Sequence, residues 1–263
     1  MESRLYTLEE NAIPVPITKP GTEILRSVIS AVVRKMVYRR LNVNGLLALF
    51  GMAGPLVLLV ADIVAIQSAS SIEHHYILTR DAISLLALMP MGWVQTIGFL
   101  AVGLFIELFT AGLFLSIRRF RGFGPGLTCL GLFGFGLLLI GAFHTDIPGQ
   151  PPTTDGSIHN AAAVVTFWLL PTAALFLVPS LKNDPKWRPI FPFTIGIAVF
   201  ALAWMLMFKL FLPDDLSWFG MYERILVAAE VLWVEAMAMW GWGLGIGGWG
   251  RSGVGAGFNG SDG

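Results

Sequence analysis

The sequence is poor in cysteine and in charged residues. Its 263 residues include a single cysteine, so neither an intramolecular disulfide nor a multi-cysteine metal site can form. Charged residues make up 13% of the chain and the net charge is zero, whereas ordinary soluble domains carry about 25% charged residues. Without a large basic block, nucleic acid is excluded as a partner. The sequence also lacks the G-x-S-x-G, H-E-x-x-H and Walker motifs of common enzymes.

Apolar residues dominate instead, at 55% of the chain, with a mean hydropathy of +0.71. A water-soluble domain of this size could not bury so much apolar surface, and a disordered chain would not carry it. A bilayer core of about 30 Å is crossed by about 20 apolar residues in a helix. The sequence therefore predicts an all-α integral membrane protein, a six-helix transmembrane bundle with spans at about 45–67, 93–117, 123–143, 160–180, 190–212 and 222–245.

Lysine and arginine are distributed unevenly between the segments that join these spans. Fourteen lie in the N-terminal segment, the tail and the loops after the second and fourth spans, and three lie on the other side, namely Arg80, Lys209 and Arg224. Basic residues concentrate on the cytoplasmic side of membrane proteins. We therefore expect both termini to be cytoplasmic.

Two terminal segments flank the predicted bundle, which covers residues 45–245. Residues 1–44 include an apolar stripe at helical spacing over about 23–41, which predicts a basic amphipathic helix on the membrane surface. The alternative is that this helix docks on another membrane subunit. Its membrane-surface residues are Arg26, Arg34, Lys35, Arg39 and Arg40. Residues 246–263 are rich in glycine and predict a flexible tail.

Polar residues gather at the end of the spans that is predicted to face outside. The candidates there are Asp62, Arg80, Asp81, Ser84, His144, Asp146, His159, Tyr222, Glu223 and Arg224. The simplest interpretation is a structural hydrogen-bond cluster that caps helix ends and pairs the arginines. One alternative is a site for zinc or haem, because histidine and aspartate are accepted ligands. Its ligands would be His144, Asp146 and His159. Another alternative is a site for a ligand or a lipid headgroup.

Three acidic residues lie deeper in the spans, at Glu107, Glu230 and Glu235. Charged groups inside a membrane are costly and usually face a cavity or a partner. A carboxyl group that faces the bundle interior would suit a proton relay. The third span is also studded with glycine, which lets helix backbones approach closely and predicts a central position for this span.

Three segments taken together resemble a known family. They are TRDAISLLALMPMGWVQTIGFLAVGLFI, GAFHTDIPG followed by SIHNAAA, and GMYERILVAAEVLW. Their order and spacing are similar to those of the bacterial six-span proteins catalogued as domain-of-unknown-function family 998, over about 45–245. The resemblance implies the same topology in a bacterial cytoplasmic membrane but no reaction. The matching polar positions are Arg80, Asp81, Ser84, Asp146, His159, Tyr222 and Arg224. The chain departs from the family at His144, where a proline is usual.

Because these positions come from different helices, they suit one outward-facing polar pocket. The favoured function is that of a non-enzymatic membrane protein without a cofactor, which binds lipid or serves as an accessory subunit of a larger membrane complex. Its partners would be membrane lipids, and membrane subunits contacted through the N-terminal helix and the tail. One alternative is a metal-dependent membrane hydrolase in which a metal held by the His/Asp residues activates water. A further alternative is a small proton-coupled transporter that uses the three deep carboxyl groups.

Overall fold

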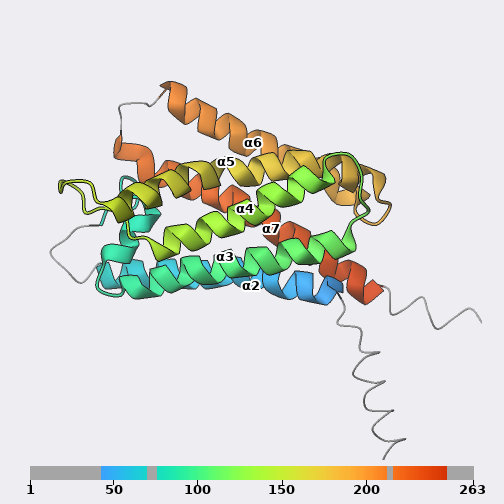
Figure 1. The fold of residues 1–263 in the computed structure, drawn as a ribbon, viewed down its shortest axis with the longest axis horizontal. Coiled ribbons are helices and arrows are strands. Elements are labelled where there is room, and N and C mark those ends of the chain that lie inside the picture. The colour runs from blue at the N-terminus through green and yellow to red at the C-terminus, as the bar shows by residue number, and fades with distance from the viewer. Residues whose placement is uncertain (1–42, 70–75, 212–215, 248–263) are drawn as a thin grey trace, which may run out of the picture. The chain divides into compact units, whose positions relative to one another are not determined.

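The computed structural model describes residues 43–69, 76–211 and 216–247, and this part of the chain is all-helical (Figure 1). Its long helices are α2 (Val43–Ala69), α3 (Gly92–Ser116), α4 (Phe123–Ala142), α5 (Thr154–Asn183), α6 (Phe191–Phe211) and α7 (Phe219–Gly247). Three short 3-10 helices precede α3, α6 and α7, namely η1 (Ile83–Leu88), η2 (Arg188–Ile190) and η3 (Leu216–Trp218). The predicted terminal segments, including the helix at about 23–41 and the tail, lie outside the described residues.

Six helices are long and apolar enough to cross a membrane, which confirms the predicted multi-pass architecture. Most helix ends lie within a few residues of their predicted positions. The exception is α5, for which the predicted start at 160 is wrong, because the helix begins at Thr154. The Thr153 side chain accepts the Gly156 N–H at 3.0 Å and caps the helix. The apolar run begins only later, so hydropathy alone placed the start too far along the chain.

The helices pack largely in chain order. Helix α3 lies between α2 and α4, α4 also packs on α5, and α7 closes against the other side of α2 (Figure 1). Glycines let α4 approach both neighbours: a Cβ on Gly134 would lie 3.1 Å from the Gly103 carbonyl oxygen of α3, and one on Gly126 would lie 2.8 Å from Leu177 of α5. The glycine-rich third span is therefore a central packing element, as its composition predicted.

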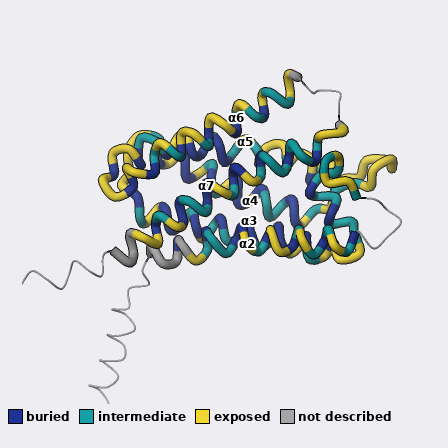
Figure 2. The backbone as a smooth tube through the Cα atoms, turned by 180° about the vertical axis from the view of Figure 1, so that it is seen from behind, coloured by how far each residue is buried: buried dark blue, intermediate teal, exposed yellow. Residues whose placement is uncertain are grey.

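Helix α6 lies at the edge of the bundle, where it contacts α5 and, less extensively, α7. Most of its length is exposed (Figure 2). Its buried residues are Thr194, Ala198, Ala201 and Met205, which recur at the spacing of one helix face. Trp233 of α7 donates its indole N–H to the Thr194 hydroxyl at 3.2 Å. The other face of α6 is exposed and largely apolar, which suits a membrane-spanning helix at the edge of a bundle.

Because consecutive long helices run in opposite directions, the connecting segments meet at two ends of the bundle. We call the end that carries residues 76–91, 143–153 and 216–218 the polar end, and the end that carries residues 117–122 and 184–190 the basic end. The two basic-end segments are joined by Asp184, whose carboxylate accepts the backbone N–H groups of Arg118 and Lys186, each at 2.9 Å. The basic residues of both segments therefore share one end, as the predicted topology requires.

Candidate functional site

Arg224, in the second turn of α7, binds the segment that precedes η1. Its guanidinium donates to four oxygens, namely the carbonyls of Leu78 at 2.8 Å, Asp81 at 3.0 Å and Gly220 at 2.9 Å, and the hydroxyl of Tyr76. The Tyr76 hydroxyl in turn donates to the Ala82 carbonyl at 2.8 Å. Burial raises the pKa of this phenol, so it stays protonated and can keep donating. We call this group the Arg224 clamp.

Two acidic residues extend the clamp. The buried Glu223 side chain accepts the backbone N–H of Ile83 at 2.7 Å. Asp81 accepts from Arg80 at 2.7 Å and from the Ile77 N–H at 2.8 Å. Partial burial acts to raise the pKa of Asp81, but these hydrogen bonds and the charges of Arg80 and Arg224 outweigh it, so the pKa lies below its ordinary value. These polar residues therefore fasten the start of α7 to the 76–83 segment.

Two of the three predicted metal ligands, His144 and Asp146, lie in the connection between α4 and α5, and the third, His159, lies in the second turn of α5. Asp146 accepts both the backbone N–H and the hydroxyl of Thr153, at 3.0 and 2.6 Å. His159 is buried and its Nδ1 lies 2.8 Å from the Phe143 carbonyl oxygen. Because a carbonyl oxygen only accepts, this nitrogen must carry the proton. His144 is exposed. Within the described ranges, no three histidine, cysteine, aspartate or glutamate side chains gather as a metal site.

Two more polar-end residues have other neighbours. Asp62 of α2 accepts from the side chain of Gln95 of α3 at 2.6 Å. Tyr222 stacks on Phe208 of α6, with 3.9 Å between ring centroids. The polar residues that the sequence singled out are thus divided among the clamp, the α4–α5 connection and these two contacts. Three of them, Ser84, His159 and Glu223, come together at one further place.

That place is a cavity inside the bundle, lined by η1 and by every long helix except α6. The volume of the cavity is about 70 Å³. Fifteen of its twenty lining residues are apolar. The five polar ones are Ser84, His159, Thr166, Glu223 and Glu230. The cavity is therefore a largely apolar space with a few polar groups, as ligand sites usually are.

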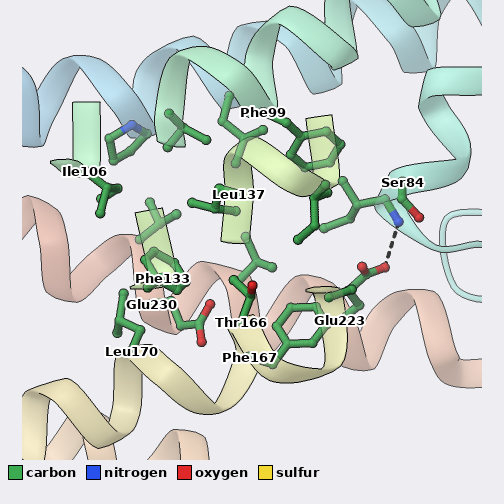
Figure 3. A pocket seen from close by; sticks show the side chains of 18 of the residues that line it. Ser84, Phe99, Ile106, Phe133, Leu137, Thr166, Phe167, Leu170, Glu223 and Glu230 are labelled. Atoms are coloured by element: carbon green, nitrogen blue, oxygen red, sulfur yellow. Dashed lines mark hydrogen bonds between the residues drawn. The ribbon is translucent and has the colours of Figure 1, made fainter. Parts of the chain in front are cut away.

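The polar groups of the cavity lie on two levels. His159 and Thr166 of α5 are seven residues apart, and so are Glu223 and Glu230 of α7. Seven residues make about two helical turns, or about 10 Å, and bring side chains back to the same face. Since α5 and α7 both run from the polar end to the basic end, His159 and Glu223 form an upper level near the polar end. Thr166 and Glu230 form a lower level near the middle of α5 and α7 (Figure 3).

Four buried side-chain polar atoms of the described residues lack a hydrogen-bond partner; two are on this lower level, and Gln95 Oε1 and Trp187 Nε1 lie outside the cavity. Glu230 and Thr166 are each 3% exposed. Among the described residues, Glu230 Oε1 and Thr166 Oγ1 have no hydrogen-bond partner, and Figure 3 shows both side chains in the cavity. Gly136 of α4 makes room for the threonine, because a Cβ there would lie 2.0 Å from Thr166 Oγ1. Sequence reasoning missed Thr166, although its seven-residue spacing from His159 was visible.

The three deep carboxyl groups do not share one space. Glu230 lines the cavity. Glu107 of α3 lies in an open groove between α3 and α4, and Glu235 of α7 lies in a groove between α2 and α7. A continuous chain of these three groups, which the proton-coupled alternative would favour, is not present in the described structure.

Comparison with known proteins gives one match. A family model described as protein of unknown function (DUF998) matches residues 52–240. No curated protein and no solved structure matches the chain. The matched range covers well over half of the 263 residues and includes all the cavity-lining residues and the Arg224 clamp. The chain therefore belongs to the DUF998 family, the family that its sequence resembles.

Proposed function

We propose that this protein binds a membrane lipid in the cavity, and that it does so without catalysing a reaction. One observation carries the proposal: two polar atoms, Glu230 Oε1 and Thr166 Oγ1, are buried in a mostly apolar space without a partner in the described part of the chain. A buried polar group without a hydrogen bond costs about 1–3 kcal/mol. A bound molecule that supplies the missing hydrogen bonds would recover this free energy.

Water alone is a poor occupant of this cavity. A buried water needs a cavity volume of about 10–15 Å³ and two to four polar partners. The cavity volume of about 70 Å³ has room for several waters, but most of the cavity wall is hydrocarbon and offers them no hydrogen bond. An amphipathic lipid suits both parts of the wall. Its chain would pack against side chains such as Phe167, Leu137 and Val227, and its polar group would bond to Glu230 and Thr166.

The test combines two substitutions that remove the free polar atoms. Thr166→Val keeps the shape of the side chain, and Glu230→Leu replaces the carboxyl group with hydrocarbon. The wild-type protein and the double variant are released gently from their native membranes, and retained lipid is measured by native mass spectrometry. Unfolding of delipidated samples is measured in parallel. Glu107→Leu is the matched control, because Glu107 is a span carboxyl group outside the cavity.

If the cavity binds lipid, the double substitution should lower lipid retention and raise the stability of the delipidated protein. The double variant should retain less lipid, while its delipidated form should be more stable by about 1–3 kcal/mol because two unsatisfied groups are gone. Glu107→Leu should leave lipid retention unchanged. If the double variant keeps its lipid, or if it loses stability instead of gaining it, then Glu230 and Thr166 are structural groups and the proposal is wrong.

The orientation and location belong to the same proposal. We infer a bacterial cytoplasmic membrane with both termini inside, supported by the basic residues of the basic end and by the resemblance of the sequence. In a Cys129→Ser background, a membrane-impermeant maleimide should label Gln150→Cys in intact cells and Lys186→Cys only after permeabilisation. Labelling in the reverse order would contradict the inference.

Docking of the predicted helix at about 23–41 on a membrane subunit is the second partner proposal, and loss of co-purified protein on deletion of residues 1–42 would support it.

A further inference from the structure

A groove between α2 and α7 runs beside the cavity. Its volume is about 460 Å³, and it is open to the outside of the bundle. Five residues line both the groove and the cavity, namely Pro55, Leu58, Ile83, Val227 and Val231. A single layer of side chains therefore separates the cavity from the bilayer at this position.

The geometry of α2 explains why the groove opens here. Toward the basic end the two helices touch, because a Cβ on Gly51 would lie only 2.5 Å from the Cβ of Ala238. Four residues later, Pro55 has no N–H to donate to the Gly51 carbonyl, and a proline inside a helix loosens or bends it. Beyond Pro55 the helices are separated by the groove, which continues to Asp62 and Arg224.

The charges along this route have mostly one sign. Asp62 and Glu235 line the groove, and Glu223 and Glu230 line the cavity. Among the described residues that line either space, Arg224 is the one lysine or arginine, and its terminal nitrogens already donate to oxygens of the clamp. The free carboxyl oxygen of Glu230 thus lies on a route whose ionisable residues are mostly acidic, and Arg224 lines the groove but not the cavity that holds Glu230.

Resting on the proposed lipid-binding function, we infer that the ligand is an amine-bearing lipid, which enters from the bilayer through the α2–α7 groove and places its ammonium group against Glu230 and Thr166. An ammonium group has three N–H donors and no acceptor. It satisfies a carboxyl oxygen and a hydroxyl oxygen together, and it brings the positive charge that a buried carboxylate lacks. A lipid carboxylate has no N–H or O–H group to donate to these two oxygens.

The test uses three twelve-carbon probes that differ only in the head group: dodecylamine, dodecanol and dodecanoic acid, each with a photoreactive diazirine in the chain. The full-length protein is placed in phosphatidylcholine nanodiscs, and labelled peptides of α5 and α7 are quantified by mass spectrometry. The amine should label these peptides at least about tenfold more than the acid, because one charge-assisted hydrogen bond is worth about that factor. Glu230→Gln should abolish this preference, whereas Glu107→Gln should keep it.

The route is tested by filling the groove. Ala228 is exposed and lines the groove but not the cavity, so Ala228→Trp should slow labelling by the amine several-fold while leaving its final extent unchanged. Ala161→Trp, at an exposed position on α5 outside both spaces, is the matched control and should label at the wild-type rate. Equal labelling by amine and acid, a preference that survives Glu230→Gln, or equal rates for the two tryptophan variants would overturn the inference. If none of the three probes labels the cavity, the proposed lipid binding itself is wrong.

Discussion

Replacing Arg224 with methionine is the sharpest test of the clamp. Methionine keeps a long apolar stem but has no N–H donor, so three backbone carbonyls and the Tyr76 hydroxyl lose one donor each. A hydrogen bond from a charged donor contributes about 1.5–3 kcal/mol, but the four are not additive and water can replace the one to the exposed Leu78 carbonyl. We therefore expect Arg224→Met to lower the free energy of unfolding by about 1.5–3 kcal/mol, roughly the contribution of one charge-assisted hydrogen bond.

The assay compares three variants in the same detergent by denaturant unfolding, together with hydrogen exchange of residues 76–83. Arg224→Lys should recover only part of the loss, because an ammonium group cannot spread its donors as the guanidinium fork does. Arg80→Met is the matched control: the Arg80 side chain is 52% exposed and its salt bridge is with the neighbouring Asp81, so we expect little change. If Arg224→Met destabilises the protein no more than Arg80→Met, or leaves exchange in 76–83 unchanged, the clamp does not hold this segment.

Three further predictions concern single side chains. Gly136→Ala places a Cβ in steric conflict with Thr166 Oγ1 and should destabilise the protein by about 1–3 kcal/mol. In a Thr166→Ala background the same change should be neutral, or stabilising by up to about 1 kcal/mol because alanine has the higher helix propensity. Equal effects in both backgrounds would refute the close contact. Asp184→Ala leaves two backbone N–H groups without their acceptor and should cost about 2–4 kcal/mol in thermal or denaturant unfolding; a neutral result would show that water reaches this turn. Since the pKa of Asp81 is lowered in the folded protein, its stabilising contribution is complete above the unfolded pKa of about 3.9 and is lost as the pH falls through the lower folded value. The stability difference between the wild type and Asp81→Asn should therefore be constant above about pH 5 and shrink below about pH 4, and a difference that shrinks near neutrality would contradict the assignment.

The helices were predictable because hydropathy measures the property that the bilayer selects. All six spans were found from apolar runs alone. The start of α5 was missed because its first turn, beginning Thr154 and Asp155, is polar and is stabilised by the Thr153 cap. A hydropathy criterion does not detect the polar turns of a helix that extends beyond its apolar run. The error in the predicted start of α5 therefore comes from the criterion, since the local structure is an ordinary capped helix.

The site was less predictable, because a sequence gives the angle of a residue about its own helix but not which helix it faces. Glu230 and Glu235 are five residues apart, about 140° around a helix, so they could not both face one space, and they line different ones. The pairing of Glu223 with Glu230 on one face was readable from their spacing of seven. That α5 places Thr166 opposite them depends on how the helices pack, which the spacing along one helix cannot reveal.

The position of the unused polar atoms bears on where function resides in this protein. At the polar end, where the sequence is richest in charge, Arg224, Asp81 and Asp146 bond to backbone and side-chain groups that close the connections between helices. These residues are explained by the fold itself. Deep in the bundle, polar groups are rarer and their burial is more costly. Yet, within the described chain, Glu230 and Thr166 keep free polar atoms there. A fold selected only for stability would replace both with hydrocarbon, so a bound molecule is the better explanation for the pair, and the few polar residues of the lower level are a stronger indication of function than the many at the polar end.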